Sequence, residues 1–330
     1  MKILVLFYDS AIGGGQKAIT QLADILEQHH TIKRVSIKQI DSSKITWLGK
    51  NRLLFSARAL MKAYNKEQAQ VIFTTLYGCG LLALILRICT LGKVKYVYRE
   101  ATNIALGLSR LQRLLTYFII KLSDVTIFNS QEQKKDQERF HHNLCFVPNI
   151  NKTAKLTRKR NRGIVMVGRC VEMKNFERGI DLLQQLEQYK LLVYTTNTNS
   201  NYLDLLRKHA MDNGVLNRLE IHLNETDKDV MYSNEILYIA SDFEGSPNIL
   251  FEALSRGVPV LSEPIKYGIK EFVDNETTGV ILSMSSKPYD ISQIIRKLRE
   301  VDAQRIQKQF QNMNLLETST LNLNDIFHDN

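Results

Sequence analysis

Residues Ser241–Val260 read SDFEGSPNILFEALSRGVPV, and this stretch decides the fold. A Gly-Ser-Pro run follows Glu244, and apolar residues at helical spacing come next, so the stretch predicts a tight turn that opens onto a helix over 248–256. Pro247 suits the first turn of a helix, because the N–H that proline lacks would have no helical partner there. Gly257 is placed to end the helix, and the VPVL that follows predicts a buried strand.

This turn is suited to binding an anion. A helix N-terminus directs free backbone N–H groups and the positive end of the helix dipole at a ligand. Glu244 lies before the turn and Glu252 within about two helical turns after it. The two glutamates can therefore bracket a ligand whose phosphates sit at the N-terminus. The alternative is an ordinary buried strand–turn–helix unit with two solvated glutamates.

The whole stretch resembles the donor-site motif of family 4 glycosyltransferases, which are retaining enzymes of the GT-B fold. The resemblance implies an α/β fold of two facing doubly wound, Rossmann-like domains with a central cleft. It also implies that Glu244 lies near the donor sugar and that Glu252 binds the ribose of the nucleotide. The backbone of the turn would hold the sugar and phosphate through Ser246, Pro247, Asn248 and Ile249. The resemblance covers most of the chain and is strongest over residues 163–283.

Two cations in the second half are candidate diphosphate ligands. Gly168-Arg169 closes the first expected strand of that half, and Lys174-Asn175 opens its first helix. Arg169 can bind phosphate as a planar fork and Lys174 as a point charge. Two such cations can stabilise a diphosphate leaving group without a metal. This spacing also matches the family, and the alternative is a pair of solvated surface cations.

Glycines follow the first expected strand of the first half. Gly14 and Gly15 belong to a Gly-Gly-Gly run that lacks the pattern of a dinucleotide-binding turn and the Lys-Ser/Thr of a P-loop. The resemblance implies that a glycine pair here lets the backbone approach the donor phosphates. The alternative is a flexible turn between strand and helix.

Arg99 and Glu100 end the expected strand KVKYVY, and strand C-termini face the ligand in this architecture. Many family members have a histidine near this place that contacts the donor sugar. Arg99 and Glu100 stand there instead and are candidate catalytic residues, with a buried Arg–Glu pair as the alternative. Residues 227–229 read Asp-Lys-Asp, which we interpret as a solvated helix start rather than a metal–nucleotide signature.

The composition, 44% hydrophobic and 24% charged over 330 residues, indicates a globular protein of two domains. Short apolar runs alternate with helix-length amphipathic segments, which predicts parallel sheets covered by helices. A basic stretch, Lys152–Arg162, is the expected linker. We therefore expect an acceptor-binding domain over 1–155, a nucleotide-sugar-binding domain over 156–310 and a tail over 311–330 that crosses back to the first domain.

The net charge of +10 is unevenly distributed. Residues 1–157 carry a net charge of +13 and residues 158–330 a net charge of −3, so the first half predicts an anionic partner. Two segments, Arg52–Lys62 and Leu106–Lys121, mix basic and apolar residues. Each could lie on an anionic membrane or pack as a core helix with a basic edge. The predicted membrane contacts are Arg52, Arg58, Lys62, Arg110 and Arg113.

The resulting hypothesis is a retaining glycosyltransferase of the hexosyltransferase type that uses a UDP- or GDP-sugar and no metal or other cofactor. Its expected acceptor is a hydroxyl of a lipid-linked saccharide in bacterial capsule, O-antigen or lipopolysaccharide biosynthesis. We expect a monomer or weak homodimer in the cytoplasm, peripheral on the inner face of the cell membrane. Nucleic acid is disfavoured, because base-stacking aromatics are not interleaved with the basic residues. The alternatives are a nucleotide-sugar epimerase of the GT-B fold and a non-catalytic GT-B protein that binds partners through its basic half.

Overall fold

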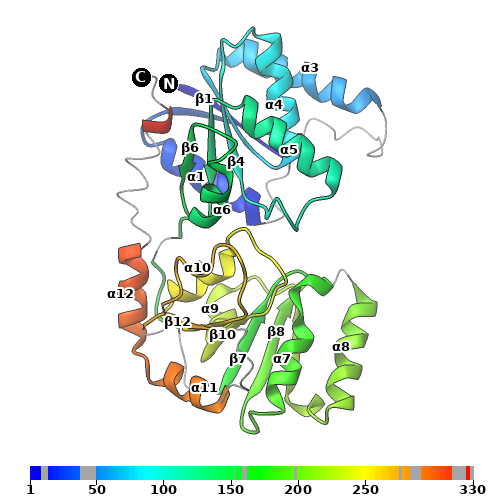
Figure 1. The fold of residues 1–330 in the computed structure, drawn as a ribbon, viewed down its shortest axis with the longest axis vertical. Helices are drawn as coiled ribbons and strands as arrows, with labels where there is room; N and C mark the ends of the chain where they lie inside the picture. The colour runs from blue at the N-terminus through cyan, green and yellow to red at the C-terminus, as the bar shows by residue number, and fades with distance from the viewer. Residues whose placement is uncertain are drawn as a thin grey trace. The chain divides into compact units, whose positions relative to one another are not determined.

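The computed structural model describes residues 1–8, 14–37, 50–151, 153–157, 162–196, 199–274, 277–282, 291–313 and 325–327, and side chains in these ranges except those of residues 50–56. The chain divides into two compact units (Figure 1). Unit 1 comprises Met1–Ile150 together with Leu316–Asn330, and unit 2 comprises Asn151–Leu315. Each unit has a parallel sheet with helices packed against it, which is the two-domain α/β architecture of the GT-B fold.

Unit 1 is built on a sheet with the strand order β2-β1-β3-β4-β5-β6, in which every neighbouring pair is parallel. Its strands are β1 (Lys2–Phe7), β2 (Thr31–Ser36), β3 (Val71–Thr75), β4 (Lys95–Glu100), β5 (Val125–Phe128) and β6 (Leu144–Phe146). Its helices are α1 (Gly14–Leu26), α3 (Lys50–Glu67), α4 (Tyr77–Cys89), α5 (Arg110–Leu122) and α6 (Gln131–Gln137).

The side chains of β1 show how this sheet is buried on both faces. Leu4 and Leu6 belong to one apolar cluster, while Ile3, Val5 and Phe7 belong to another. Successive residues of a strand point to opposite faces, so a strand covered on both sides is apolar throughout. The run Ile-Leu-Val-Leu-Phe is therefore a strand inside the sheet that is covered on both faces.

Unit 2 repeats this design with the strand order β12-β11-β10-β7-β8-β9, again parallel throughout. Its strands are β7 (Gly163–Val167), β8 (Lys190–Thr195), β9 (Leu219–Leu223), β10 (Ile236–Ile239), β11 (Val260–Ser262) and β12 (Gly279–Ile281). Its helical segments are η1 (Glu172–Lys174), α7 (Phe176–Leu183), α8 (Ser200–Asp212), η2 (Leu216–Arg218), α9 (Lys228–Met231), α10 (Asn248–Leu254), α11 (Ile291–Glu300) and α12 (Ala303–Met313).

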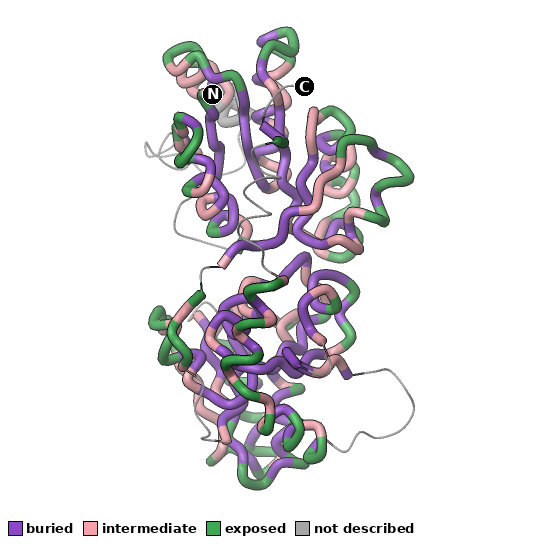
Figure 2. Tube along the Cα trace, turned by 90° about the vertical axis from the view of Figure 1, so that its left-hand side faces the viewer, coloured by how far each residue is buried: buried purple, intermediate pink, exposed green. Residues whose placement is uncertain are grey.

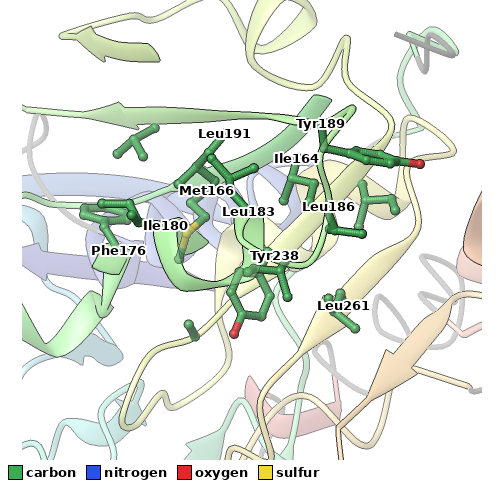
Figure 3. Packing of buried hydrophobic residues seen from close by; sticks show 14 of the residues in the cluster. Ile164, Met166, Phe176, Ile180, Leu183, Leu186, Tyr189, Leu191, Tyr238 and Leu261 are labelled. Atoms are coloured by element: carbon green, nitrogen blue, oxygen red, sulfur yellow. The ribbon is translucent and has the colours of Figure 1, made fainter. Parts of the chain in front are cut away.

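Each unit has its own apolar interior, as the buried residues in Figure 2 show. In unit 2, Met166 and Leu191 from adjacent strands pack with Ile180 and Leu183 of α7 (Figure 3). Gly179 allows this close packing, because a Cβ on it would lie 2.5 Å from the sulfur of Met166. The strands that carry the site are therefore held by a dense core.

The C-terminal residues Ile326 and Phe327 are part of unit 1. Both belong to the apolar cluster that contains Phe73 of β3, and Phe327 is fully buried. The rings of Phe73 and Phe327 meet edge to face with their centroids 5.4 Å apart. A segment at the far end of the sequence thus completes the core around a central strand.

Candidate functional site

The site residues of unit 2 lie where the strand order of its sheet reverses. This reversal falls between β7 and β10, since β8 and β9 extend the sheet on one side and β11 and β12 on the other. In open parallel sheets, ligands bind at the carboxyl ends of the two strands that flank such a reversal. Arg169 and Lys174 follow β7, and Glu244 follows β10. The topology therefore brings Lys174 to Glu244 and places Arg169 in the same loop as Lys174.

Lys174 and Glu244 form an ion pair, with Nζ 2.5 Å from Oε1. Their side chains are only 13% and 14% exposed, so little solvent screens the two charges. The methylenes of Lys174 pack over Gly168, where a Cβ would lie 3.2 Å from them. The small residue before Arg169 thus gives the lysine its path to the glutamate.

Three hydrogen bonds join the loops that carry this pair. Asn175 has left-handed geometry, with φ 48° and ψ 50°. Its Nδ2 donates to the carbonyl of Ala240 at 2.9 Å and to Oδ1 of Asp242 at 2.6 Å. The N–H of Asp242 donates in turn to the carbonyl of Met173 at 3.0 Å. These bonds fix the loop after β7 against the loop after β10.

Arg169 stands apart from the ion pair. It is exposed, and among the described residues its guanidinium has no ion-pair or hydrogen-bond partner. Its place directly after β7 leaves it available to an anionic ligand at the strand ends.

The predicted turn and helix are present over Glu244–Gly257. α10 spans Asn248–Leu254, slightly shorter than the range expected from the sequence. Pro247 is its N-cap residue, and the carbonyl of Pro247 accepts from the N–H of Leu250 at 3.1 Å. Gly257 ends the helical segment as predicted, with φ 75° and its N–H donating to the carbonyl of Leu254.

A second glycine, Gly268, supports this turn from outside. Its φ is 73°, and a Cβ on it would lie 2.5 Å from both the carbonyl oxygen of Gly245 and the Cα of Ser246. Real Cβ atoms essentially never come so close to backbone. Gly268 therefore lets one loop lie directly against the turn between the two glutamates. The sequence alone shows only a lone glycine after Tyr267, so it gave no sign of this contact.

Glu252 lies on α10 and is only 5% exposed. Its Oε2 accepts from the hydroxyl of Tyr232 at 2.9 Å and lies 2.9 Å from Nζ of Lys228. Burial raises the pKa of Tyr232 well above its ordinary value, so this phenol stays protonated and can donate. The carboxylate is thus held in one orientation by a donor and a cation.

Lys228 and Tyr232 are site residues that the sequence analysis missed. The interpretation of 227–229 as a helix start is confirmed, because Oδ1 of Asp227 accepts from the N–H of Asp229 at 2.8 Å and caps α9. Lys228 is not simply solvated, however, since it contacts Glu252. The spacing of four between Lys228 and Tyr232 signals a shared helical face. Nothing local indicates which carboxylate that face meets.

The candidates of unit 1 lie on separate elements. Gly14 and Gly15 open α1 after β1. A Cβ on Gly15 would have ordinary contacts, the nearest at 3.5 Å from the Cβ of Ala101. The described backbone therefore does not itself require a glycine at position 15. Gly13, the first residue of the run, lies outside the described residues.

Arg99 and Glu100 end β4 and are buried, at 0% and 2% exposure. They do not form the direct pair that was the alternative. Arg99 Nη2 donates to Oδ1 of Asn149 at 2.6 Å, while Glu100 accepts from the hydroxyl of Tyr98 at 2.9 Å and the N–H of Thr102 at 2.7 Å. Burial lowers the pKa of Arg99 to about 10 and raises the pKa of Glu100. Both side chains lie in the interior of unit 1.

The described residues provide neither a metal cluster nor a membrane-spanning helix. Within those ranges, no three His, Cys, Asp or Glu side chains gather where they could hold a metal ion. No helix in the described part of the chain has the length and apolarity needed to cross a membrane.

Comparison with known proteins identifies the class. The fold, together with a family match in the second half of the chain, supports a glycosyltransferase of the GT-B type. Residues 149–312 match the family described as glycosyl transferases group 1, and this range contains the Lys174–Glu244 pair and Glu252. A protein named as an uncharacterized glycosyltransferase from Haemophilus influenzae is 22% identical over 299 residues, which cover 83% of each chain.

Two solved structures illustrate the likeness of fold. The structure of HepE from Anabaena in complex with UDP and glucose has a TM-score of 0.74 at 16% identity, covering 99% of this chain and 97% of that one. The lipopolysaccharide outer core galactosyltransferase WaaB, in its apo form, has a TM-score of 0.74 at 15% identity, covering 99% of both chains.

Proposed function

We propose that the protein is a retaining glycosyltransferase of family 4 that moves a hexose from a UDP- or GDP-sugar to a hydroxyl group. The Lys174–Glu244 ion pair at the strand reversal of unit 2 carries this proposal. A largely buried cation beside a largely buried carboxylate suits a donor with an anionic diphosphate and a hydroxyl-rich sugar. Lys174 can bind the phosphates, and Glu244 can accept hydrogen bonds from the sugar.

The ion pair also suggests the order of events on donor binding. Lys174 has one carboxylate partner before the donor arrives. A diphosphate offers it a stronger, more highly charged acceptor. Once Lys174 turns to the phosphates, the carboxylate of Glu244 is free to bind sugar hydroxyls. Exposed Arg169 supplies the second cation for the leaving group.

Glu252 is the proposed ribose ligand. Its orientation is already fixed by Tyr232 and Lys228, so it loses little freedom when it accepts the ribose hydroxyls. Ser246, Pro247, Asn248 and Ile249 are the proposed backbone contacts to sugar and phosphate. The contact of Gly268 with Gly245 and Ser246 supports this assignment, because it fixes the position of that backbone.

In the proposed reaction, the bond between the anomeric carbon and the phosphate oxygen breaks, and the electron pair stays on the nucleoside diphosphate. The acceptor oxygen forms a bond to the same face of that carbon. A phosphate oxygen of the leaving group takes the acceptor proton. Arg169 and Lys174 neutralise the charge that develops on the diphosphate, so the mechanism requires no metal.

The proposed acceptor is a lipid-linked saccharide at the inner face of a bacterial cell membrane. WaaB, whose fold this chain shares, is a galactosyltransferase of the lipopolysaccharide outer core. HepE, which has the same fold, was solved in complex with UDP and glucose. The net charge of +13 in residues 1–157 also favours an acceptor presented at an anionic surface. These observations support bacterial surface-polysaccharide assembly as the pathway.

Donor hydrolysis and transfer assays test this function. Thermal-shift screening against nucleotides and nucleotide sugars identifies the base, and release of nucleoside diphosphate is then measured with and without acceptor extracts. Acceptor-dependent release that persists in EDTA supports a metal-independent transferase. Conversion of the nucleotide sugar without acceptor would indicate an epimerase. Absence of binding across the panel would indicate a non-catalytic protein.

A further inference from the structure

The outer face of α5 carries a stripe of large apolar side chains in contact with solvent. Leu111, Leu114, Phe118 and Leu122 are 66%, 52%, 50% and 45% exposed. Steps of three and four residues place them along one side of the helix. We call these four residues the α5 stripe. The opposite side of the helix, with Thr116, Ile119 and Ile120, is buried in unit 1.

The end of α4 extends the apolar surface. α4 lies beside α5 (Figure 1), and an ion pair between Arg87 and Asp124 joins the last turn of α4 to the segment after α5. Ile88 and Leu91, on either side of the end of α4, are 64% and 88% exposed. Single exposed apolar residues are common on soluble proteins, but a row of them on one helix face marks an interaction surface.

The charges around the stripe are basic. Arg110 and Lys121 are exposed, and the helical repeat puts both on the same flank of the stripe. The sequences of α4 and α5 together contain four Lys and Arg residues and no acidic residue. α5 therefore presents a core side, an apolar outer side and a basic flank, which is the pattern of a helix lying in a membrane interface.

We propose that the α5 stripe inserts into the headgroup region of an anionic lipid bilayer while Arg110 and Lys121 contact the lipid phosphates. A second copy of the chain is a poorer partner, because a symmetric contact would place this basic surface against itself. An anionic membrane satisfies both the apolar and the basic parts. The inference deepens the proposed membrane-linked acceptor by naming the attachment surface, and it requires none of the donor-site residues.

Vesicle flotation tests the surface. The wild type and a Leu114→Ser/Phe118→Ser variant are compared on phosphatidylcholine vesicles with and without phosphatidylglycerol. The matched control is Leu205→Ser/Met211→Ser, since these residues lie on α8 of unit 2 and are 59% and 61% exposed. We expect the α5 variant to lower the partition coefficient on anionic vesicles about tenfold or more, because several methylene-sized groups leave the bilayer. The α8 control should bind like the wild type.

A fluorescence experiment tests insertion itself. Trp47 is the single tryptophan of the chain, so a Phe118→Trp change in a Trp47→Phe background reports on the stripe alone. Anionic vesicles should shift its emission to the blue, and lipids brominated on the acyl chains should quench it. An Arg110→Gln/Lys121→Gln variant should bind anionic vesicles at least about tenfold more weakly than the wild type. Its binding to neutral vesicles should not change.

The proposal would be overturned if the α5 and α8 variants bound anionic vesicles equally well. It would also be overturned if brominated lipid did not quench the emission of the introduced tryptophan. A dimer in vesicle-free solution that Leu114→Ser/Phe118→Ser dissociates, without vesicle binding by the wild type, would assign the stripe to a second copy instead. Donor hydrolysis in vesicle-free solution separates this result from the proposed function. If the wild type binds vesicles but does not hydrolyse the donor, the proposed transferase function is wrong and the proposed membrane contact of the α5 stripe stands.

Discussion

Gly268→Ala tests whether the turn between the two glutamates must be held in place. The added Cβ would lie 2.5 Å from Gly245 O and Ser246 Cα, whereas ordinary contact begins at 3.4 Å. The turn or the loop of Gly268 must therefore shift by about 0.9 Å. Misplacing a reacting group by about 1 Å can reduce an enzymatic rate about 10²-fold. We expect kcat/KM for the nucleotide sugar to fall by that order.

Gly214→Ala is the matched control. Gly214 has φ 68°, close to the 73° of Gly268, but no heavy atom lies within 4 Å of the Cβ position. Both substitutions force alanine into the left-handed region, at a cost of about 1–2 kcal/mol. Only Gly268→Ala adds the collision with the turn. The difference between the two variants thus isolates the positioning effect from the backbone cost.

Three measurements decide the outcome. Denaturant unfolding gives the stability of each variant, calorimetry gives nucleotide affinity, and initial rates give kcat/KM. We expect both variants to be destabilised, and nucleotide binding and turnover to fall in Gly268→Ala alone. If the folded Gly268→Ala protein keeps the kcat/KM of Gly214→Ala, the turn does not need this support and the reasoning is wrong.

The other predictions concern charged groups. Glu252→Ala should chiefly weaken nucleotide affinity, whereas Glu244→Ala should impair transfer and spare nucleoside diphosphate binding; calorimetry that shows the reverse would exchange their roles. Arg169→Ala and Lys174→Ala should each slow transfer on the order of 10²–10³-fold, by analogy with removal of an oxyanion-hole donor, and unchanged turnover in both would remove them from the site. Burial raises the pKa of Glu100 above its ordinary 4.5, so its contribution to stability is full below that pH and is lost as pH rises through the higher folded-state pKa. Relative to Glu100→Gln, the wild type should therefore lose stability above about pH 4.5 in denaturant titrations; a parallel pH dependence of the two proteins would show that this carboxyl does not titrate on unfolding.

Features that depend on local chemistry could be predicted from the sequence. Gly257 was expected to end the helix because a left-handed residue is needed there, and the structure shows that conformation. The alternation of apolar strands and amphipathic helices likewise predicted two parallel sheets. These signals lie within a few residues of the structure they specify.

Contacts between distant segments could not be predicted in the same way. Lys174 and Glu244 are 70 positions apart, and only the strand order of unit 2 brings them together. Arg99 and Glu100 show the opposite case, because adjacency in sequence suggested a pair. Successive residues of a strand point to opposite faces, so the two side chains find different partners.

The α5 stripe shows a limit of hydrophobic periodicity. The spacing of Leu111, Leu114 and Phe118 fits a core-facing helix and a surface-binding helix equally well. Periodicity reveals that a face is apolar, but not whether another element covers it. Burial in the folded chain is what separates the two interpretations.

The place of Phe327 has a consequence for how the chain is made. Unit 2 is one continuous segment, whereas unit 1 contains residues from both ends of the sequence. During synthesis, all of unit 2 leaves the ribosome before Phe327 can reach Phe73. The first unit to begin folding is therefore the last to be finished, and until then its central strand has an open apolar site that a chaperone could cover.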